Sequence, residues 1–131
     1  MFNGRVMVYS VGIDLIEISR IRKGYKRFGD RYLYRLFSTD EIDLIRSKNP
    51  GAVTTIAGKF AAKEAVMKSL GAFFDDGVTF RDIEILSRIS GMPYVRLPER
   101  LQRNIEGKKV LISISHEKKF ALAAAIITDG V

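Results

Sequence analysis

The stretch FAAKEAVMK, residues 60–68, lies within a helical pattern that extends from about Ala52 to Leu70 and is followed by Gly71. On a helical wheel of about 100° per residue, the apolar residues of this segment form one stripe. Glu64 falls inside that stripe, and Lys68 lies at its edge, one turn further along. The pattern therefore predicts a long helix packed on a core, with a carboxylate on the packed side.

Two interpretations of Glu64 are open from the sequence. Glu64 and Lys68 have the i,i+4 spacing of an ordinary helical ion pair, which adds only a few tenths of a kcal/mol. However, an unpaired buried carboxylate is costly unless it binds a cation, a metal or hydrogen-bond donors. The position among Val53, Phe60 and Met67 favours a functional site over a surface ion pair.

The segments around this helix predict an α+β fold, with a mostly antiparallel sheet packed on the long helix. Helical spacing is present over 15–28 and 30–37, and Ser38 with Glu41 forms a capping-box signature for a short helix. Strands are expected at 5–13, 78–88, 94–97, 108–115 and 120–128, the last two joined as a hairpin, and a short helix at 98–107.

The whole chain is expected to be one domain, 1–131, with 1–6 as a possible N-terminal extension before an alternative start at Met7. Hydrophobic and charged contents of 47% and 28% are typical of a globular protein. No apolar run approaches the ~20 residues that cross a bilayer, and no secretory signal or cysteine is present. We therefore expect a cytoplasmic protein.

Positive charge is concentrated in one segment. The chain has a net charge of +7, and residues 20–35 contain seven basic residues against the single acid Asp30. The remainder is nearly neutral. Such a segment predicts an acidic partner: nucleic acid, an anionic membrane or an acidic protein.

A second carboxylate, Asp14, comes at the end of the first predicted strand. One interpretation is a helix N-cap, with Glu17 three residues later in a capping-box arrangement. The other is a metal or phosphate site. With no cysteine and a single histidine, two carboxylates suit Mg²⁺ better than zinc, because Mg²⁺ completes its shell with water and substrate phosphates.

Several motifs occur in the order of a known family: VGIDLIEISRI, KFAAKEAVMKSLG, FRDIEI, SGMPYV and ISISHEKKFALAAAI. From Met7 to about Thr128 the chain resembles the holo-acyl-carrier-protein synthases, the short, trimeric class of 4′-phosphopantetheinyl transferases. The GID and KEAxxK motifs are short, but their order and their combination with SISH are specific.

The resemblance implies transfer of 4′-phosphopantetheine from coenzyme A to a serine of an apo acyl carrier protein, as in fatty acid (lipid) biosynthesis. It implies that Asp14 and Glu64 bind Mg²⁺ and that Lys68 contacts the phosphates. A metal that bridges pyrophosphate oxygens offsets developing charge. The general base stays open between Glu64, acting through water, and Asp14.

The resemblance also implies further contacts to coenzyme A. His116 in SISH, with Ser115, is expected at a phosphate or the ribose, although a polar turn residue is the alternative for His116. Ser113 and Ser115 are expected to share that surface. Lys59 and Lys63 are candidates for the 3′-phosphate, with Lys59 preferred and solvent exposure as the alternative for both.

The carrier protein is acidic, so the basic segment has a natural partner. The resemblance implies carrier contacts at Arg20, Lys23 and Arg27, and it implies a homotrimer with sites between subunits. One residue departs from the family pattern: Gly24 stands where a larger apolar residue is expected to touch the carrier.

Two other function classes compete with this interpretation. Aromatic residues interleave with the basic segment, which is a property of single-strand nucleic-acid binders. However, the aromatics keep helical core spacing, and a nucleic-acid-binding role leaves Glu64 unexplained, so we expect no nucleic-acid partner and no membrane partner. A non-catalytic assembly protein is the third class, and dependence on a divalent metal and on coenzyme A separates the three.

Overall fold

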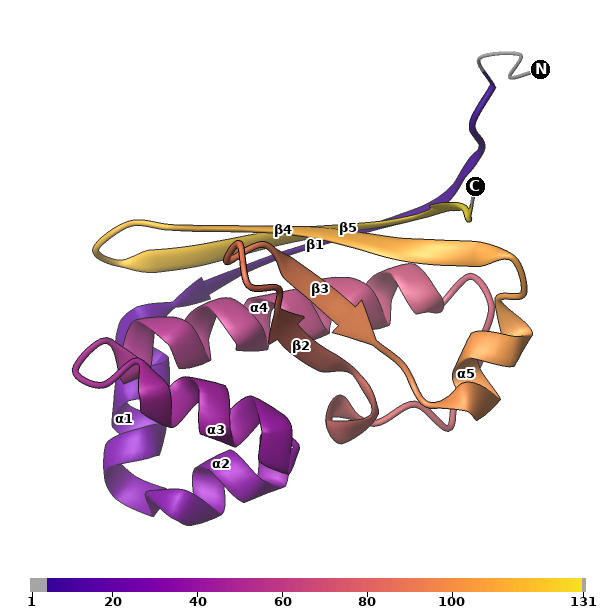
Figure 1. Ribbon diagram of the computed structural model, residues 1–131. Helices are drawn as coiled ribbons and strands as arrows, with labels where there is room; N and C mark the ends of the chain where they lie inside the picture. Colours follow the sequence, from indigo (N-terminus) through magenta and orange to yellow (C-terminus); the bar gives the residue numbers. More distant parts are fainter. Residues whose placement is uncertain (1–4, 131) are drawn as a thin grey trace.

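The computed structural model describes residues 5–130, which form a three-stranded antiparallel sheet with helices on one side (Figure 1). The strand order is β1–β5–β4, where β1 is Val8–Glu17, β4 is Lys108–His116 and β5 is Phe120–Asp129. Strands β4 and β5 pair as the predicted hairpin. A separate two-stranded antiparallel sheet consists of β2, Glu84–Ser87, and β3, Pro93–Arg96.

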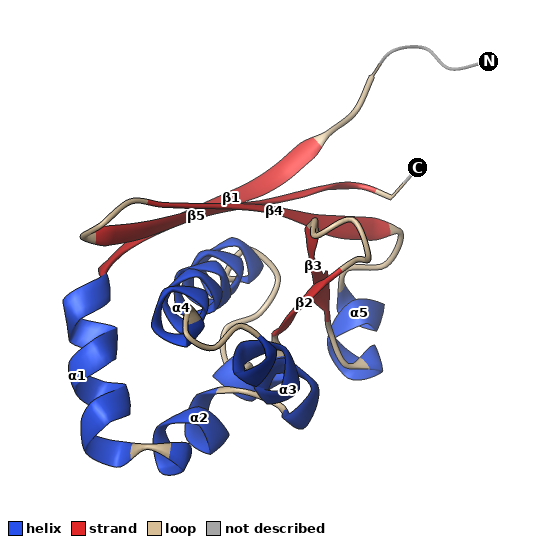
Figure 2. Cartoon of the chain, turned by 60° about the vertical axis from the view of Figure 1, so that its left-hand side comes forward, coloured by secondary structure: helices blue, strands red, loops and turns tan. Residues whose placement is uncertain are grey.

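The predicted α+β class is confirmed. The α-helices are α1 (Ile18–Phe28), α2 (Asp30–Leu36), α3 (Thr39–Ser47), α4 (Ala52–Leu70) and α5 (Glu99–Asn104), and a short 3₁₀ helix η1 covers Phe80–Asp82. Helix α4 has the predicted bounds and lies beneath the three-stranded sheet (Figure 2). The predicted capping box of α3 is present, because the Ser38 side chain accepts from Glu41 N and the Glu41 side chain accepts from Ser38 N.

Small residues let α4 approach the sheet closely. Strand β5 presents Ala121, Ala123 and Ala125, all buried, to the core that includes α4. On β1 the closest approach is at Gly12, where a Cβ atom would lie 1.9 Å from the carbonyl oxygen of Ala65. Only glycine fits there, so this position fixes the spacing between β1 and α4.

The helical wheel predicted the buried side of α4 only in part. Within the predicted packed stripe, Ile56 and Ala57 are fully buried as expected, but Val53, Phe60 and Met67 are only half-buried. Outside the stripe, Ala62, Lys63 and Val66 are also fully buried. The reason is that α4 is enclosed by β1, β4 and β5 together with α1, α3 and β2. Glu64 is itself half-buried and therefore lies on a partly exposed side of the helix, not inside the core.

The first strand is longer than the sequence predicts. Strand β1 continues to Glu17, and Asp14 pairs with Ala123 of β5 in the middle of the sheet. Helix α1 begins at Ile18, and its N-cap position, Glu17, makes no side-chain capping hydrogen bond. Asp14 is thus not a helix cap. Sheet pairing, which continues to Phe120, outweighs the local capping signal.

The outer face of the three-stranded sheet has no covering layer within the described residues (Figures 1 and 2). Large apolar side chains lie exposed on it: Val11, Ile13 and Leu15 from β1, Leu111 from β4 and Leu122 from β5. Such a continuous apolar face is typical of a protein–protein contact surface.

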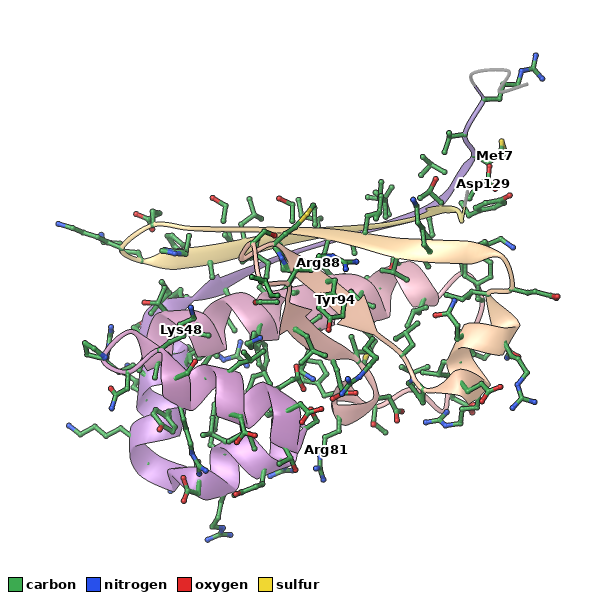
Figure 3. The ribbon with its side chains drawn as sticks, in the orientation of Figure 1. Met7, Lys48, Arg81, Arg88, Tyr94 and Asp129 are labelled. Carbon is green, nitrogen blue, oxygen red and sulfur yellow. The ribbon has the colours of Figure 1, made fainter. Side chains whose placement is uncertain are left out.

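The two ends of the described chain meet at one edge of this sheet. Met7 N and Tyr9 Oη both donate hydrogen bonds of 2.8 Å to the Asp129 carboxylate (Figure 3 labels Met7 and Asp129). The predicted N-terminal extension, residues 1–6, lies mostly outside the described part of the chain. Between residues 5 and 130, no helix has the length and apolarity needed to cross a membrane.

Candidate active site

The structure brings Asp14, Glu64 and Lys68 together where β1 crosses α4. The Lys68 ammonium reaches β1, donating to the Ile13 carbonyl at 2.9 Å and lying 3.4 Å from Asp14 Oδ1. The Asp14 side chain is 17% exposed, and that of Lys68 is 54% exposed. Lys68 thus pairs with Asp14, and no ion pair between Lys68 and Glu64 is present among the described residues.

The electrostatics of Glu64 support one shared site. Its pKa is raised, first by partial burial and then by the negative charge of Asp14, while Lys68 and Arg20 oppose the shift. Partial burial and a neighbouring negative charge both destabilise an ionised carboxylate, and a bound cation would offset both effects. The two acids are therefore close enough to interact.

The donor set fits a magnesium ion that shares its coordination with a substrate. Two carboxylates converge, and no group of three or more potential metal ligands occurs in residues 5–130. A closed protein site for zinc or calcium needs more ligands than this, whereas Mg²⁺ is commonly held by one or two carboxylates plus waters and substrate phosphates.

Lys63 occupies a different position from the one expected for a phosphate ligand. Its ammonium is fully buried and bonds to Glu41 Oε1 at 2.8 Å and to the carbonyls of Phe80 and Ile83 at 2.6 and 2.5 Å. Glu41 in turn accepts from Ile85 N at 2.9 Å. These bonds tie α3, α4, η1 and β2 together, and they leave no donor of Lys63 directed at solvent.

Lys59 and His116 line a cavity of about 520 Å³. The Lys59 ammonium is buried and donates to the Ile85 carbonyl, and burial lowers its pKa to about 8. Two further cations at the cavity, Lys48 and Arg88, were not identified from the sequence (Figure 3). They follow α3 and β2, where no local motif marks them.

Ser115 does not share a surface with His116. Side chains alternate along β4, so that Ile112 and Ile114 are half-buried and Ser113 and Ser115 are exposed on the outer face. His116 lies on the same side as Ile114, and both line the cavity. Within one copy of the chain, Ser115 is therefore on the opposite side of the sheet from the expected coenzyme A contact.

Helix α1 presents the predicted carrier-contacting residues to solvent. Arg20, Lys23 and Arg27 are all exposed. The one acid of the basic segment, Asp30, bonds instead to Arg46 of α3 at 3.0 Å. Arg20 lies close enough to Glu64 for its charge to oppose the rise in the pKa of Glu64.

Comparisons with known proteins agree on one family. Residues 10–125 match the family model described as the 4′-phosphopantetheinyl transferase superfamily. A holo-[acyl-carrier-protein] synthase of Protochlamydia amoebophila is 42% identical over 121 residues, which cover 92% of this chain and 98% of that protein.

Two solved structures are similar over nearly their full length. The holo-[acyl-carrier-protein] synthase of Helicobacter pylori in complex with coenzyme A has a TM-score of 0.78 and 34% identity, covering 89% of this chain and 98% of that one. The Bacillus anthracis holo-(acyl-carrier-protein) synthase in complex with CoA (3′,5′-ADP) has a TM-score of 0.76 and 31% identity, covering 94% and 98%.

Proposed function

The chain belongs to the 4′-phosphopantetheinyl transferase superfamily, and we propose that Asp14, Glu64 and Lys68 are its catalytic centre. Its activity is that of a holo-[acyl-carrier-protein] synthase. It transfers 4′-phosphopantetheine from coenzyme A to a serine of an apo acyl carrier protein and releases adenosine 3′,5′-bisphosphate. The observation that carries the catalytic assignment is the pairing of Lys68 with Asp14 across β1 and α4 and the electrostatic interaction of both residues with Glu64.

Asp14 and Glu64 would hold Mg²⁺ together with the pyrophosphate of coenzyme A. When bound, Mg²⁺ would offset the negative charge that develops on the phosphate oxygens during transfer. The strand places Asp14 rigidly, because Asp14 is paired within the sheet, and α4 places Glu64 on its partly exposed side. Rigid elements of this kind preorganise charged groups better than loops do.

Lys68 is the positively charged phosphate ligand in this arrangement. Its ammonium already lies between the backbone of β1 and the Asp14 carboxylate, and its side chain is more than half exposed. A small shift would let the ammonium donate to an oxygen of the leaving bisphosphate. That contact stabilises the charge left when the bond between the β-phosphorus and the bridging oxygen breaks.

Glu64 accepts the proton of the attacking serine through an intervening water. The serine oxygen bonds to the β-phosphorus as adenosine 3′,5′-bisphosphate leaves, and the serine proton must pass to a base. The raised pKa of Glu64 makes it a better proton acceptor than an ordinary surface glutamate. Asp14 is the less suitable base, because its Oδ1 atom is already paired with the Lys68 ammonium at 3.4 Å.

The adenosine bisphosphate end of coenzyme A is assigned to the cavity lined by Lys59 and His116. Its volume of about 520 Å³ is in the range of small-molecule sites. Lys48, Lys59 and Arg88 surround it with positive charge suited to a 3′-phosphate. Lys63 serves the same site indirectly, because its buried bonds hold α4 against β2.

A homotrimer with sites between subunits is the assembly we infer. The exposed apolar face of the three-stranded sheet supplies a contact surface, and Ser115 lies on that face. Ser115 would then reach coenzyme A only at the site of a neighbouring copy. Leu15→Asp should dissociate the assembly, which sedimentation analysis would show. An unchanged sedimentation coefficient would argue against this surface.

The fatty acid pathway and the cytoplasm are the setting we infer, with the whole chain acting as one domain. The reaction is tested by mass spectrometry of an apo acyl carrier protein incubated with this protein, coenzyme A and Mg²⁺. The carrier should gain one phosphopantetheine. Lys68→Ala should lower the turnover rate far more than it weakens carrier binding. A wild-type protein that leaves the carrier's mass unchanged would contradict the activity.

A further inference from the structure

Glu41 of α3 is fully buried, whereas its neighbour Asp40 is exposed. A buried carboxylate needs hydrogen-bond donors, and Glu41 has three of them. Its Oε1 atom accepts from Ser38 N at 3.0 Å and from the Lys63 ammonium at 2.8 Å, and its Oε2 atom accepts from Ile85 N at 2.9 Å. The helix cap and the ion pair use Oε1 alone, so neither of them accounts for the bond between Oε2 and β2.

The bond from Ile85 connects Glu41 to Lys59. The Ile85 N–H donates to Glu41, and the carbonyl of the same residue accepts from the Lys59 ammonium. Glu41, the backbone of β2 and Lys59 thus form one chain of hydrogen bonds that joins α3 to α4. Ile85 and Lys59 both line the cavity of about 520 Å³. Because Glu41 fixes the Ile85 backbone, it also fixes the carbonyl that holds the Lys59 ammonium at the cavity wall.

The charge of Glu41 acts on Lys59 as well. Burial lowers the pKa of Lys59 to about 8, and Glu41 opposes this shift more strongly than either Lys63 or Lys48 reinforces it. The negative charge of Glu41 therefore helps to keep Lys59 protonated near neutral pH. The charged and titratable groups around Lys59 come from each element packed against it: Glu41 of α3, Lys48 at the end of α3, Lys63 of α4, Arg88 beyond β2 and His116 of β4.

We propose that Glu41 is a positioning residue for coenzyme A: it fixes the Ile85 backbone and places a negative charge near Lys59, so that the Lys59 ammonium is held ready for the 3′-phosphate. This inference rests on the proposed function, which places the adenosine bisphosphate end of coenzyme A in that cavity. Glu41 itself touches no substrate atom and acts through Lys59. A lysine that binds phosphate must be protonated, and a buried lysine without a nearby anion loses its proton readily.

A role of Glu41 in stability alone predicts different consequences. A buried ion pair often adds no net stability compared with apolar side chains of similar volume. If Glu41 only stabilised the fold, its loss would affect all substrates alike at every pH. If Glu41 positions Lys59, its loss affects the substrate that carries a 3′-phosphate, and it does so at the pH values where Lys59 loses its proton.

Glu41→Gln tests the charge, because glutamine keeps the side-chain length and an acceptor oxygen for Ile85 N but carries no negative charge. The pKa of Lys59 then falls further, so the KM for coenzyme A should rise at lower pH than in the wild type. We expect a KM at least threefold above the wild type at pH 7.5, and within twofold of it at pH 6, where Lys59 is protonated in both proteins. With dephospho-coenzyme A, the KM values of the two proteins should agree within twofold at both pH values.

Two further variants show whether the effect passes through Lys59. Asp43→Asn is the matched control, because it removes one negative charge from an exposed residue of the same helix. It should leave the KM for coenzyme A within twofold of the wild type at both pH values. In a Lys59→Arg background, where the cation stays charged, adding Glu41→Gln should no longer change the pH dependence of that KM. A change that persists in this background would overturn the proposal.

Folding of Glu41→Gln is checked by circular dichroism and urea unfolding, since the variant leaves the Lys63 ammonium buried beside a neutral partner. If it does not fold, Glu41→Gln is combined with Lys63→Met, which removes the buried cation as well. The double variant should show the same change in KM with a smaller size, because Glu41 acts on Lys59 more strongly than Lys63 does.

The pH profiles separate the failure of this inference from that of the proposed function. A folded Glu41 variant whose KM for coenzyme A follows the wild-type profile would overturn the positioning role, and so would an equal rise in the KM for dephospho-coenzyme A. In either case a wild-type KM that rises through pH 8 would leave the proposed function standing. A wild-type KM for coenzyme A that stays constant through pH 8 would overturn both this inference and the proposed contact between Lys59 and the 3′-phosphate.

Discussion

Replacing Gly12 with alanine should separate the two halves of the catalytic centre. Gly12 lies on β1 two residues before Asp14, and it faces Ala65 of α4, the residue after Glu64. The added methyl group would lie 1.9 Å from the Ala65 carbonyl oxygen and 3.0 Å from Ser69 N. Both atoms belong to the helix backbone, so no side-chain rotation can relieve the overlap.

The size of the effect follows from that geometry. Carbon atoms of this kind do not approach closer than 3.0 Å, so α4 and β1 must separate by at least about 1.1 Å. Overpacking of an interior typically costs about 1–3 kcal/mol of unfolding free energy. A displacement of about 1 Å at a catalytic centre can lower the rate by about 100-fold. We therefore expect a folded but weakened enzyme with kcat reduced by about two orders of magnitude.

Urea unfolding and steady-state transfer kinetics measure the two effects separately. Gly51→Ala is a suitable control, since the nearest atom to its new methyl group is 3.1 Å away and the residue precedes α4 far from Asp14. The control should keep kcat within twofold. A folded Gly12→Ala protein with normal kcat would refute the reasoning, because the spacing between β1 and α4 would then not control the catalytic geometry.

Three further predictions follow from the ion pairs and the charged surfaces. Lys63→Met should lower the free energy of unfolding by about 3–5 kcal/mol in urea titrations, because it leaves the Glu41 carboxylate buried without its cation. A loss below about 1 kcal/mol would contradict a stabilising role of the Lys63–Glu41 pair. Lys59 is charged below its pKa of about 8 and neutral above it, so the KM for coenzyme A should rise as the pH increases through 8. Dephospho-coenzyme A, which lacks the 3′-phosphate, should show no such rise. Matching pH profiles for the two substrates would exclude a contact between Lys59 and the 3′-phosphate. Arg20→Ala should raise the carrier KM and flatten its dependence on salt with little change in kcat, and an unaltered salt dependence would show that Arg20 is only solvated.

Local signals in the sequence predicted much of the fold. The bounds of α4 and the Ser38–Glu41 capping box depend on residues close in sequence, and the structure reproduces both. The end of β1 could not be predicted in this way. A helix cap at Asp14 satisfies local rules, but pairing of β1 with β5 extends the strand to Glu17, and that partner is more than 100 residues away.

The candidate site was only partly predictable for the same reason. The wheel showed that Glu64 was unusual and placed Ile56 and Ala57 correctly in the core, but it missed the burial of Ala62, Lys63 and Val66, because it does not include the elements that enclose α4. Lys59 and Lys63 looked like surface lysines beside the stripe and are both buried. Lys63 is neutralised by Glu41 of α3, a partner that only the tertiary fold supplies. From the residues, a metal site shared by Asp14 and Glu64 was one of two open interpretations of Asp14, and the family resemblance favoured it.

Gly24 is a position where the sequence indicated an unusual feature but could not show its geometry. Gly24 was noticeable as a departure from the family pattern, and in isolation it indicated a lost contact. The structure shows a hollow formed with Tyr32 of α2 and rimmed by arginines from both helices. From Gly24 in the sequence alone, a change in the shape of this surface cannot be distinguished from the loss of an apolar contact.

The most direct test of the account is divalent-metal binding by the two carboxylates. Binding of Mn²⁺, as a spectroscopic substitute for Mg²⁺, is titrated by electron paramagnetic resonance in the presence of coenzyme A for the wild type, Asp14→Asn and Glu64→Gln. Asp43→Asn, an exposed change on α3, is the control. We predict that each site variant weakens Mn²⁺ binding at least tenfold while the control matches the wild type. Unchanged Mn²⁺ affinity in both folded site variants would contradict the assignment of Asp14 and Glu64 as the metal-binding pair.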